Sequence, residues 1–402
     1  MNLLIIGAGA AGLFAAVVAA RRGISVTVLD KNKTAGKKLR ITGKGRCNLT
    51  NNCTRDEFFA NITANSRFLY SAYSRFSSQD TMSFFEDLGV PLKTERGNRV
   101  FPQSDNAHEI ADALVNECKR LSVKFREFNV TEILHDDQKI TGVSNGKEEI
   151  KTDAIILATG GKSYPGTGSD GSGYKLASAL GAKITDIRPS LIPLITKESF
   201  VKELKGLSLR NVKLSITEDS KTVFTEQGEM LFTDYGISGP LVLSASAHIR
   251  NPEHSIAHID LKPALDHITL DKRILRDFSE NPNRIFANAL DKLLPASLRP
   301  VIVNISGING EKRVNAVTKT EREGLVKLLK DLTLTITGFR PIAEAIITRG
   351  GVSVSDIDPK TMEFKKMKNL YFAGEIIDLD AYTGGYNLQI AFTTAHSAAN
   401  SI

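Results

Sequence analysis

A glycine-rich turn between a strand and a helix is the feature that most constrains how this chain can fold. Residues 3–6 (LLII) predict a short buried strand, and residues 10–22 predict a helix that ends before a glycine. Residues 25–29 (SVTVL) predict the next strand, and the turn 7–12 (GAGAAG) joins the first strand to the helix. A strand–helix–strand unit of about 30 residues implies a parallel sheet with a right-handed crossover.

The residue types in this turn are those that a dinucleotide requires. Gly7 permits a tight turn, Gly9 lets the backbone approach a pyrophosphate, and Gly12 allows the helix to pack on the sheet. The helix N-terminus then offers free N–H groups to the phosphates. Asp30, which follows the second strand, can accept hydrogen bonds from ribose hydroxyls and would repel the 2′-phosphate of NADP. FAD and NAD are both compatible with this turn, and the alternative is a packing turn with a surface aspartate.

Composition excludes several classes of protein. The 402 residues are enough for two or three domains. Three cysteines, Cys47, Cys53 and Cys118, form no CxxC pair, which argues against a disulfide framework or a zinc site and fits a cytoplasmic protein. Seven histidines show no metal-ligand spacing, so we expect no metal centre. The net charge of +7 is compatible with an anionic cofactor, a nucleic-acid partner or neither.

The apolar run at the start of the chain has a second interpretation. Residues 3–20 are uncharged and could be read as a membrane span or a signal peptide. No basic residue precedes the run, three glycines interrupt it, and a second strand follows it directly. We therefore expect the dinucleotide fold and no membrane partner.

Hydrophobic patterning indicates an α/β fold, with a nucleotide-binding domain interrupted by a β domain that itself carries a small helical insert. The expected nucleotide-binding domain comprises residues 1–189 and 345–402, the β domain 190–262 and 331–344, and the helical insert 263–330. A hairpin is expected around Gly228 in the β domain.

Residues 31–55 differ from the rest of the chain. They contain eight basic residues, no acidic residue and three glycines, which predicts a glycine-bent basic loop. One FAD pyrophosphate does not need eight cations. The surplus is either solvated surface or a contact for the phosphates of RNA.

Two further glycine-rich segments follow predicted buried strands. The strand 154–159 ends at Gly160 and Gly161, where the chain could pass close to a planar ligand. The nearby segment 166–171 (GTGSDG) also matches GxGxxG but does not directly follow a strand, so we do not assign it to a second nucleotide. The last strand, 369–373, precedes a helix start that could stabilise negative charge on a reduced flavin.

Together these motifs resemble the BaiN-like (YhiN-like) FAD-dependent oxidoreductases of the glutathione-reductase-like superfamily. The matching stretches are GAGAAG (7–12), GKKLRITGKGRCNLTN (36–51), ATGGKSYPGTGSDGSGY (158–174), GEMLFTDYGISGP (228–240) and FAGEIIDLDAYTGGYNLQIAF (372–392). The resemblance implies non-covalent FAD and a three-part α/β fold, a Rossmann-like FAD-binding domain interrupted by a β-barrel-like domain that itself carries a small helical insert. This agrees with the organisation and the domain boundaries above. NAD(P)H is a candidate transient electron donor.

The resemblance implies contacts with FAD along four parts of the chain and at one adenine-binding residue, Val130, expected in a strand over 128–133. The cofactor-binding residues are Gly7, Gly9, Ala10, Ala11, Gly12, Asp30, Lys31, Lys38, Leu39, Thr42, Gly43, Gly45, Arg46, Cys47, Asn48, Val130, Ala158, Thr159, Gly160, Gly374, Glu375, Asp378, Gly385, Tyr386, Asn387 and Leu388. Lys44 departs from the family pattern GGGRCN, and we expect its side chain to point to solvent.

The catalytic residue is left open, with Cys47 and Tyr386 as candidates. Cationic neighbours would lower the pKa of Cys47, but a packing role is the alternative. Tyr164 and Tyr235 also lie in motif loops and could donate protons. The family's substrates include small amines, steroid acids and a uridine of ribosomal RNA. Three functions thus stay open: reduction of an RNA uridine, oxidation of a small metabolite, and RNA binding with structural FAD. The oligomeric state cannot be read from the sequence.

Overall fold

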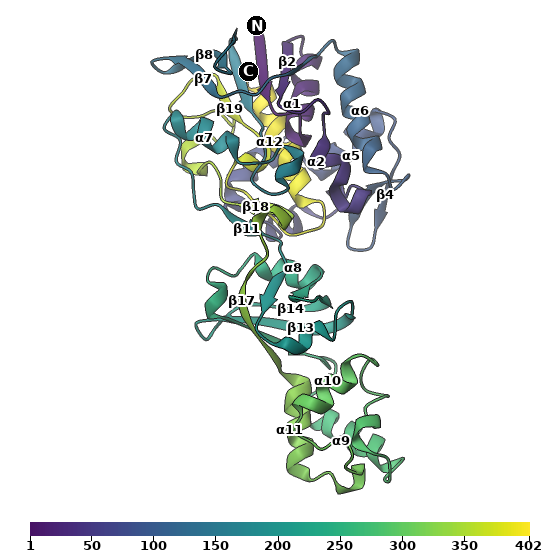
Figure 1. Cartoon of the computed structure of the whole chain (residues 1–402). Coiled ribbons are helices and arrows are strands. Elements are labelled where there is room, and N and C mark those ends of the chain that lie inside the picture. Colours follow the sequence, from purple (N-terminus) through teal and green to yellow (C-terminus); the bar gives the residue numbers. More distant parts are fainter. The chain divides into compact units, whose positions relative to one another are not determined.

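The computed structural model describes all residues, 1–402, and divides into two compact units. The first unit comprises Met1–Ser190 and Pro341–Ile402, and the second comprises Leu191–Arg340 (Figure 1). The chain therefore leaves the first unit and returns to it, as expected for a domain interrupted by an insert.

A five-stranded parallel sheet forms the centre of the first unit. Its strand order is β19-β10-β1-β2-β6. The strands are β1 (Asn2–Ile6), β2 (Ser25–Asp30), β6 (Lys124–Glu127), β10 (Ala154–Leu157) and β19 (Leu370–Phe372). The central strand β1 and the two strands on one side of it, β10 and β19, are almost wholly buried. Their continuous apolar sequences are typical of buried parallel strands. The parallel sheet places the carboxyl ends of these strands at one edge, where the glycine turn begins.

Three long helices, α1 (Ala10–Arg21), α6 (Ala107–Arg120) and α12 (Tyr386–Asn400), belong to the same unit, and α1 contacts both of the others (Figure 1). Phe14 is fully buried in α1 and packs against Phe76, Phe84 and Phe392. This aromatic cluster fixes the start of the chain to its last helix.

Short elements fill the connection between β2 and β6. The helices are α2 (Lys37–Ile41), α3 (Arg55–Ala60), α4 (Tyr70–Tyr73) and α5 (Ser78–Asp87). Capping boxes at Thr54 and Ser77 begin α3 and α5. A small antiparallel sheet, β3-β5-β4, joins Thr50–Asn51, Arg99–Pro102 and Leu92–Glu95. The sequence did not predict this sheet, because its strands are only two to four residues long.

The remaining elements of the first unit are β7 (Glu132–Asp136), β8 (Lys139–Ser144), β9 (Glu149–Lys151), α7 (Ser172–Ala179), β11 (Arg188–Ser190) and β18 (Ile347–Arg349). The strands β11 and β18 pair with each other where the chain leaves and re-enters the unit.

The second unit contains a closed barrel with strand order β12-β15-β14-β13-β16-β17. Its strands are β12 (Leu194–Thr196), β13 (Ser208–Glu218), β14 (Lys221–Phe232), β15 (Gly236–Ser238), β16 (Ser255–Asp260) and β17 (Leu332–Phe339). The helices of this unit are α8 (Pro240–Ser246), α9 (His267–Ser279), α10 (Leu298–Ile305) and α11 (Lys319–Lys330). The fold class expected from the sequence is thus confirmed.

Two details differ from the expectation in the second unit. The hairpin turns at Asp219 and Ser220, while Gly228 lies inside β14 opposite a register shift. The helix α8 was not expected in the segment 190–262, which was assigned to the β domain; Pro240 stands at its start, where proline favours a helix. No helix of the structure combines the length and apolarity needed to cross a bilayer.

A buried carboxylate makes the stability of the first unit depend on pH. Glu117 in α6 is 6% exposed, and Arg120 and Arg21 both donate hydrogen bonds to it, at 2.7 and 2.8 Å. These contacts, chiefly that of Arg120, lower the pKa of Glu117 to about 2 from its ordinary 4.5. Because the folded pKa is depressed, the stabilisation is complete above about pH 4.5 and is lost as the pH falls toward 2.

We therefore expect Glu117→Gln to lower the free energy of unfolding by about 1–3 kcal/mol at pH 7 and by much less at pH 3. Urea titrations of both proteins at the two pH values measure this difference. An equal loss at pH 7 and pH 3 would show that the charge of Glu117 contributes nothing.

Candidate functional site

The glycine turn at the end of β1 is shaped for a ligand. A Cβ added to Gly7 would lie 2.5 Å from the carbonyl oxygen of Ala158, and one added to Gly12 would lie 1.8 Å from the carbonyl oxygen of Gly7. Gly7 and Gly12 are therefore required by packing. Gly9 caps α1, and a Cβ there would meet nothing within 4 Å. The open space lies at the N-terminus of α1, where Ala10 and Ala11 begin the helix.

Asp30 lies beside this turn at the end of β2. One carboxylate oxygen accepts a hydrogen bond from the N–H of Ala8 at 2.7 Å, and the other accepts two from Asn32. A carboxylate offers about four acceptor positions, so a ribose hydroxyl can still bind. A cavity of about 180 Å³ opens here, lined by Ala8, Asp30, Asn32 and Lys33 among others. Asp30 thus both orders the turn and faces a small cavity.

Val130 is placed differently from its prediction. It lies in the irregular segment between β6 and β7, not in a strand over 128–133. The predicted strand is wrong over 128–131, which are irregular, and right only from Glu132, where β7 begins. The N–H of Phe128 donates to the carbonyl of Asp30. This bond brings the segment to the end of β2. The main-chain groups of Val130 are outside any ladder and remain candidates for contacting adenine.

The glycine-rich segment after β10 is hydrogen-bonded to Glu375, which follows the last strand, β19. Lys38 Nζ donates hydrogen bonds to Ser163 Oγ and to Glu375 Oε2, both at 2.7 Å. Ser163 Oγ in turn donates to Glu375 Oε1 at 3.0 Å. Gly161 has no space for a side chain, because a Cβ would lie 2.4 Å from Thr348 Oγ1. Lys38 of the 37–48 loop and Glu375, two predicted parts of the site, therefore meet, and Ser163, three residues after the predicted Gly160, bonds to both.

The last part of the site approaches the first helix. A Cβ on Gly374 would lie 2.8 Å from the Cβ of Ala11, so the end of β19 lies against the N-terminus of α1. Gly385 has φ of +98°, and a Cβ there would lie 2.3 Å from the carbonyl oxygen of Thr50. Asn387 holds the preceding loop through hydrogen bonds with both main-chain groups of Ala381. We call the 7–12 turn, the 37–48 loop and the 158–163 and 373–388 segments the cradle.

The loop 42–48 is strongly bent. Gly43, Lys44, Gly45 and Cys47 all have positive φ, between 57° and 86°. Lys44 is exposed, as expected, and its left-handed conformation explains why a glycine suits this position. Leu39 is buried, and Thr42 Oγ1 donates to its carbonyl.

Cys47 has the surroundings of a packing residue, one of the alternatives left open by the sequence. It is fully buried, and burial raises the pKa of its thiol to about 12. Cationic neighbours in the sequence do not lower this pKa, because Arg46 pairs with Glu95 and Asp105 instead. Cys47 stays protonated near neutral pH.

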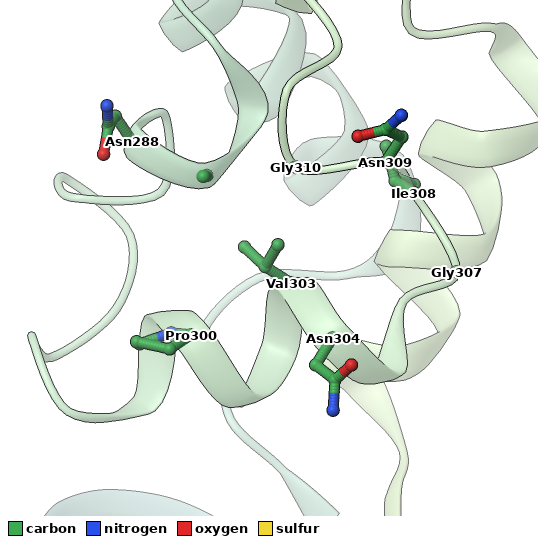
Figure 2. Close-up of a pocket in the computed structure, with 9 residues that line it drawn as sticks. Asn288, Pro300, Val303, Asn304, Gly307, Ile308, Asn309 and Gly310 are labelled. Carbon is green, nitrogen blue, oxygen red and sulfur yellow. The ribbon is translucent and has the colours of Figure 1, made fainter.

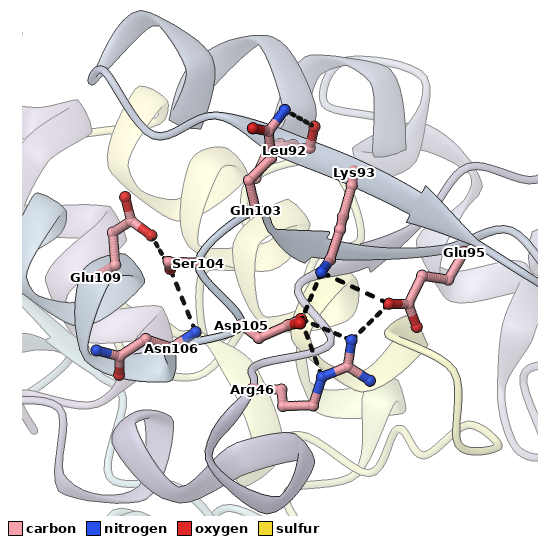
Figure 3. A network of polar contacts seen from close by, with 9 residues as sticks. All are labelled: Arg46, Leu92, Lys93, Glu95, Gln103, Ser104, Asp105, Asn106 and Glu109. Carbon is pink, nitrogen blue, oxygen red and sulfur yellow. Dashed lines mark hydrogen bonds and ion pairs between the residues drawn. The ribbon is translucent and has the colours of Figure 1, made fainter.

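Arg46 belongs to an ion-pair network on the small sheet. It donates hydrogen bonds to Asp105 and Glu95, and Lys93 contacts the same two carboxylates (Figure 3). The guanidinium also lies 4.3 Å from the ring centre of Phe101. The side chain of Arg46 therefore links the loop to the small sheet.

The basic loop is half neutralised by acids from elsewhere. Besides Arg46 and Lys38, Lys31 pairs with Asp170 at 2.6 Å and Arg40 pairs with Asp112 at 2.7 Å. The other four basic residues of 31–55 form no ion pair with an acid, and they are Lys33, Lys37, Lys44 and Arg55. The cationic surplus of the loop is thus four charges instead of eight.

Tyr386 is the first residue of α12 and is 8% exposed. Burial, together with its contact with Cys53, raises the pKa of its hydroxyl, so Tyr386 holds its proton at neutral pH. Its ring lies 6.1 Å from that of Phe58. Asp378 and Leu388 are half-buried on either side of this helix start.

A cavity in the second unit lies outside the cradle. It has about 690 Å³ and is lined by residues of the α10 region in the second unit. Figure 2 shows that Asn288, Asn304 and Asn309 point away from one another there. Without converging polar groups, this cavity offers no catalytic arrangement.

Sequence patterns missed several residues that organise the cradle. Ser163 and Thr348 both hydrogen-bond to Glu375, and Thr348 Oγ1 accepts from the N–H groups of Lys162 and Ser163. Gln389 is fully buried and accepts hydrogen bonds from Thr50 and Thr81. Single serines, threonines and glutamines carry no spacing signal, so only the fold could identify them.

The residues present fit FAD. Two buried side-chain oxygens at the cradle, Asn48 Oδ1 and Thr159 Oγ1, have no hydrogen-bond partner. Space is left at Gly9 and beside Asp30 for the pyrophosphate and ribose. Buried polar atoms ordinarily have partners, so these oxygens are suited to a bound polar cofactor.

The fold and the cradle define an FAD-dependent oxidoreductase of the Rossmann type. Residues 1–401 match the family described as HI0933-like protein Rossmann domain, and the chain belongs to this family. This confirms the resemblance drawn from the motifs.

Two curated relatives are similar over nearly their whole length. A ribosomal RNA dihydrouridine synthase of Escherichia coli K12 is 32% identical over 402 residues, covering 100% of this chain and 98% of the relative. A 3-dehydro-bile acid delta(4,6)-reductase of Clostridium scindens is 30% identical, covering 99% and 98%. A 3-ketosteroid-delta4-(5alpha)-dehydrogenase of Rhodococcus jostii shares the fold, with a TM-score of 0.53, 14% identity and coverage of 99% and 96%.

Proposed function

We propose that this chain reduces a uridine of ribosomal RNA to dihydrouridine with non-covalent FAD. The observation that carries the proposal is its similarity, over its full length, to a ribosomal RNA dihydrouridine synthase. The four unpaired cations of the 31–55 loop support it, since RNA phosphates are bound by Lys and Arg.

The activities named for the two curated relatives act on the same kind of bond. Uracil has a C5=C6 double bond conjugated with a carbonyl, and the double bonds of a 3-oxo-Δ4,6 steroid are likewise conjugated with its oxo group. Bound FAD, once reduced, would supply a hydride to such a bond. The chain must then orient the bond and supply a proton to the neighbouring carbon.

Two cradle side chains can hold that proton. Tyr386 stays protonated at the start of α12, and Cys47 stays protonated in the 42–48 loop. Tyr386 is the better candidate, because it belongs to the helix start expected beside the flavin, whereas Cys47 is fully buried. NAD(P)H is the proposed source of electrons, and it would bind transiently because the chain has no second nucleotide-binding turn after a strand.

The decisive experiment compares ribosomal nucleosides from the wild-type and the deletion strain by mass spectrometry. We expect one dihydrouridine to be lost on deletion and restored by the plasmid-borne gene. Identical dihydrouridine content in both strains would contradict the RNA substrate.

The loop cations give a separate prediction. Lys33 lines the cavity beside Asp30, so Lys37 and Lys44 are the better positions for removing charge. We expect Lys37→Ala with Lys44→Gly to weaken RNA binding without loss of FAD. Each lost phosphate contact should lower the slope of log K against log salt by about 0.7.

Glycine at position 44 suits the left-handed backbone, so this variant adds no strain. Lys147→Ala with Lys151→Ala, two exposed lysines outside the cradle, removes the same charge as a control. Equal salt slopes in the two double variants would argue that the loop does not contact RNA.

A second candidate function is reduction of a small carbonyl-conjugated substrate, which the bile acid reductase favours. Its kinetics would be insensitive to salt and to the loop lysines.

We further propose that residues 263–330 form an insert distinct from the barrel; they carry twelve basic and eight acidic residues.

A further inference from the structure

Tyr164 has a backbone conformation that its side chain does not favour. Its φ and ψ are 53° and 58°, in the left-handed region that bulky residues rarely adopt. The N–H of Tyr164 donates to the carbonyl of Ala343, and the carbonyl of Tyr164 accepts from both the N–H and Oγ1 of Thr167. The loop therefore dictates the conformation, and glycine or asparagine would adopt it at lower cost. Strained residues of this kind are concentrated at functional sites.

The ring of Tyr164 is exposed beside the cradle. It is 38% exposed, although Ser163, the preceding residue, is fully buried and hydrogen-bonded to Glu375. No other ring of the chain stacks on it. Lys162 is exposed as well and lies two residues earlier. An aromatic face and a cation thus flank Ser163, the residue that makes the buried contact with Glu375.

The loop that carries Tyr164 is held at both ends. At one end Ser163 bonds to Glu375, and at the other Lys31 pairs with Asp170. A Cβ on Gly168 would lie 2.4 Å from Asn32 Nδ2, so this glycine allows close packing. The second GxGxxG match, at 166–171, therefore belongs to a loop packed on the segment after β2. Its rigidity suits a platform for a ligand.

We propose that Tyr164 is the residue on which the substrate's pyrimidine ring stacks, with Lys162 beside the adjoining phosphate. This rests on the proposed reduction of an RNA uridine. A base within folded RNA is stacked on its neighbours and must leave the stack before its C5=C6 bond can meet a flavin. An aromatic side chain replaces part of the lost stacking and tolerates any base. The ligand class is an unstacked pyrimidine nucleotide.

The test uses the holoenzyme reduced with dithionite, which removes the need for a particular electron donor. Ribosomal RNA from the deletion strain is the substrate, and dihydrouridine formed in a single turnover is measured at increasing RNA concentration. Tyr164→Phe keeps the ring, Tyr164→Ala removes it, and Tyr164→Asn removes it while favouring the left-handed backbone. Tyr70→Ala alters a tyrosine that is 44% exposed but contacts Phe59 outside the cradle.

We expect the Ala and Asn variants to raise the half-saturating RNA concentration between about fivefold and 100-fold, with a plateau rate close to wild type. The Phe and Tyr70→Ala variants should match wild type, and flavin absorbance should be unchanged in all. Wild-type half-saturation in the Asn variant, or equal impairment of the Phe and Ala variants, would overturn the stacking role. No dihydrouridine from the wild-type protein would overturn the proposed function and the stacking role together.

Discussion

Replacing Gly9 by valine should abolish FAD binding and leave the fold intact. Gly9 has φ of −82° and ψ of −168°, which any residue adopts, and its Cβ would meet no protein atom within 4 Å. A branched side chain there would instead occupy the position of the pyrophosphate. We expect the purified variant to be colourless, with a thermal unfolding midpoint equal to that of the wild-type apoprotein.

Gly12→Ala provides the matched control, because its Cβ would lie 1.8 Å from the carbonyl oxygen of Gly7. This variant should be poorly folded, which Gly9→Val should not be. Full retention of FAD by Gly9→Val would contradict the proposed pyrophosphate position.

Replacing Tyr386 by phenylalanine should slow reduction of the substrate by about 100-fold or more, because general acid catalysis contributes at least that factor. The ring and its contact with Phe58 remain, so FAD content and RNA affinity should be unchanged. The plateau rate of the single-turnover assay measures this effect. Since the pKa of Tyr386 is raised, the wild-type rate should not fall between pH 7 and pH 9 through loss of its proton.

Cys47→Ala is the comparison for this prediction. A fully buried thiol with a pKa of about 12 should contribute packing alone, so the variant should lose stability and keep its rate. A wild-type rate for Tyr386→Phe combined with a large loss for Cys47→Ala would assign the proton to the cysteine.

The local order of elements could be predicted from the sequence because each signal lay within a few residues. The turn 7–12, with β1 before it and α1 after it, follows from apolar runs and glycines. The parallel pairing of β10 and β19 with this unit follows from their buried character. The residues proposed for the cradle lie in segments that the structure brings together at Lys38, Ser163 and Glu375.

Contacts between distant segments could not be predicted. Arg46 pairs with the carboxylates of Glu95 and Asp105, which lie 49 and 59 residues away in the sequence. That pairing takes up the positive charge of Arg46, and the neighbouring Cys47 thiol is buried, with a raised pKa. The charge of the basic loop was overestimated for the same reason, since its partners Asp112 and Asp170 lie in other elements. Charge counted along a segment does not show which charges remain unpaired in the fold.

The most direct measurement is the identity of the cofactor released by the purified protein. Denaturation and mass spectrometry of the supernatant should yield FAD in a ratio to protein near one, because the cradle leaves space at Gly9 and beside Asp30 and has two unpartnered buried oxygens. Recovery of NAD, or of FMN without its adenylate half, would contradict the assignment of the 7–12 turn and the cradle to FAD.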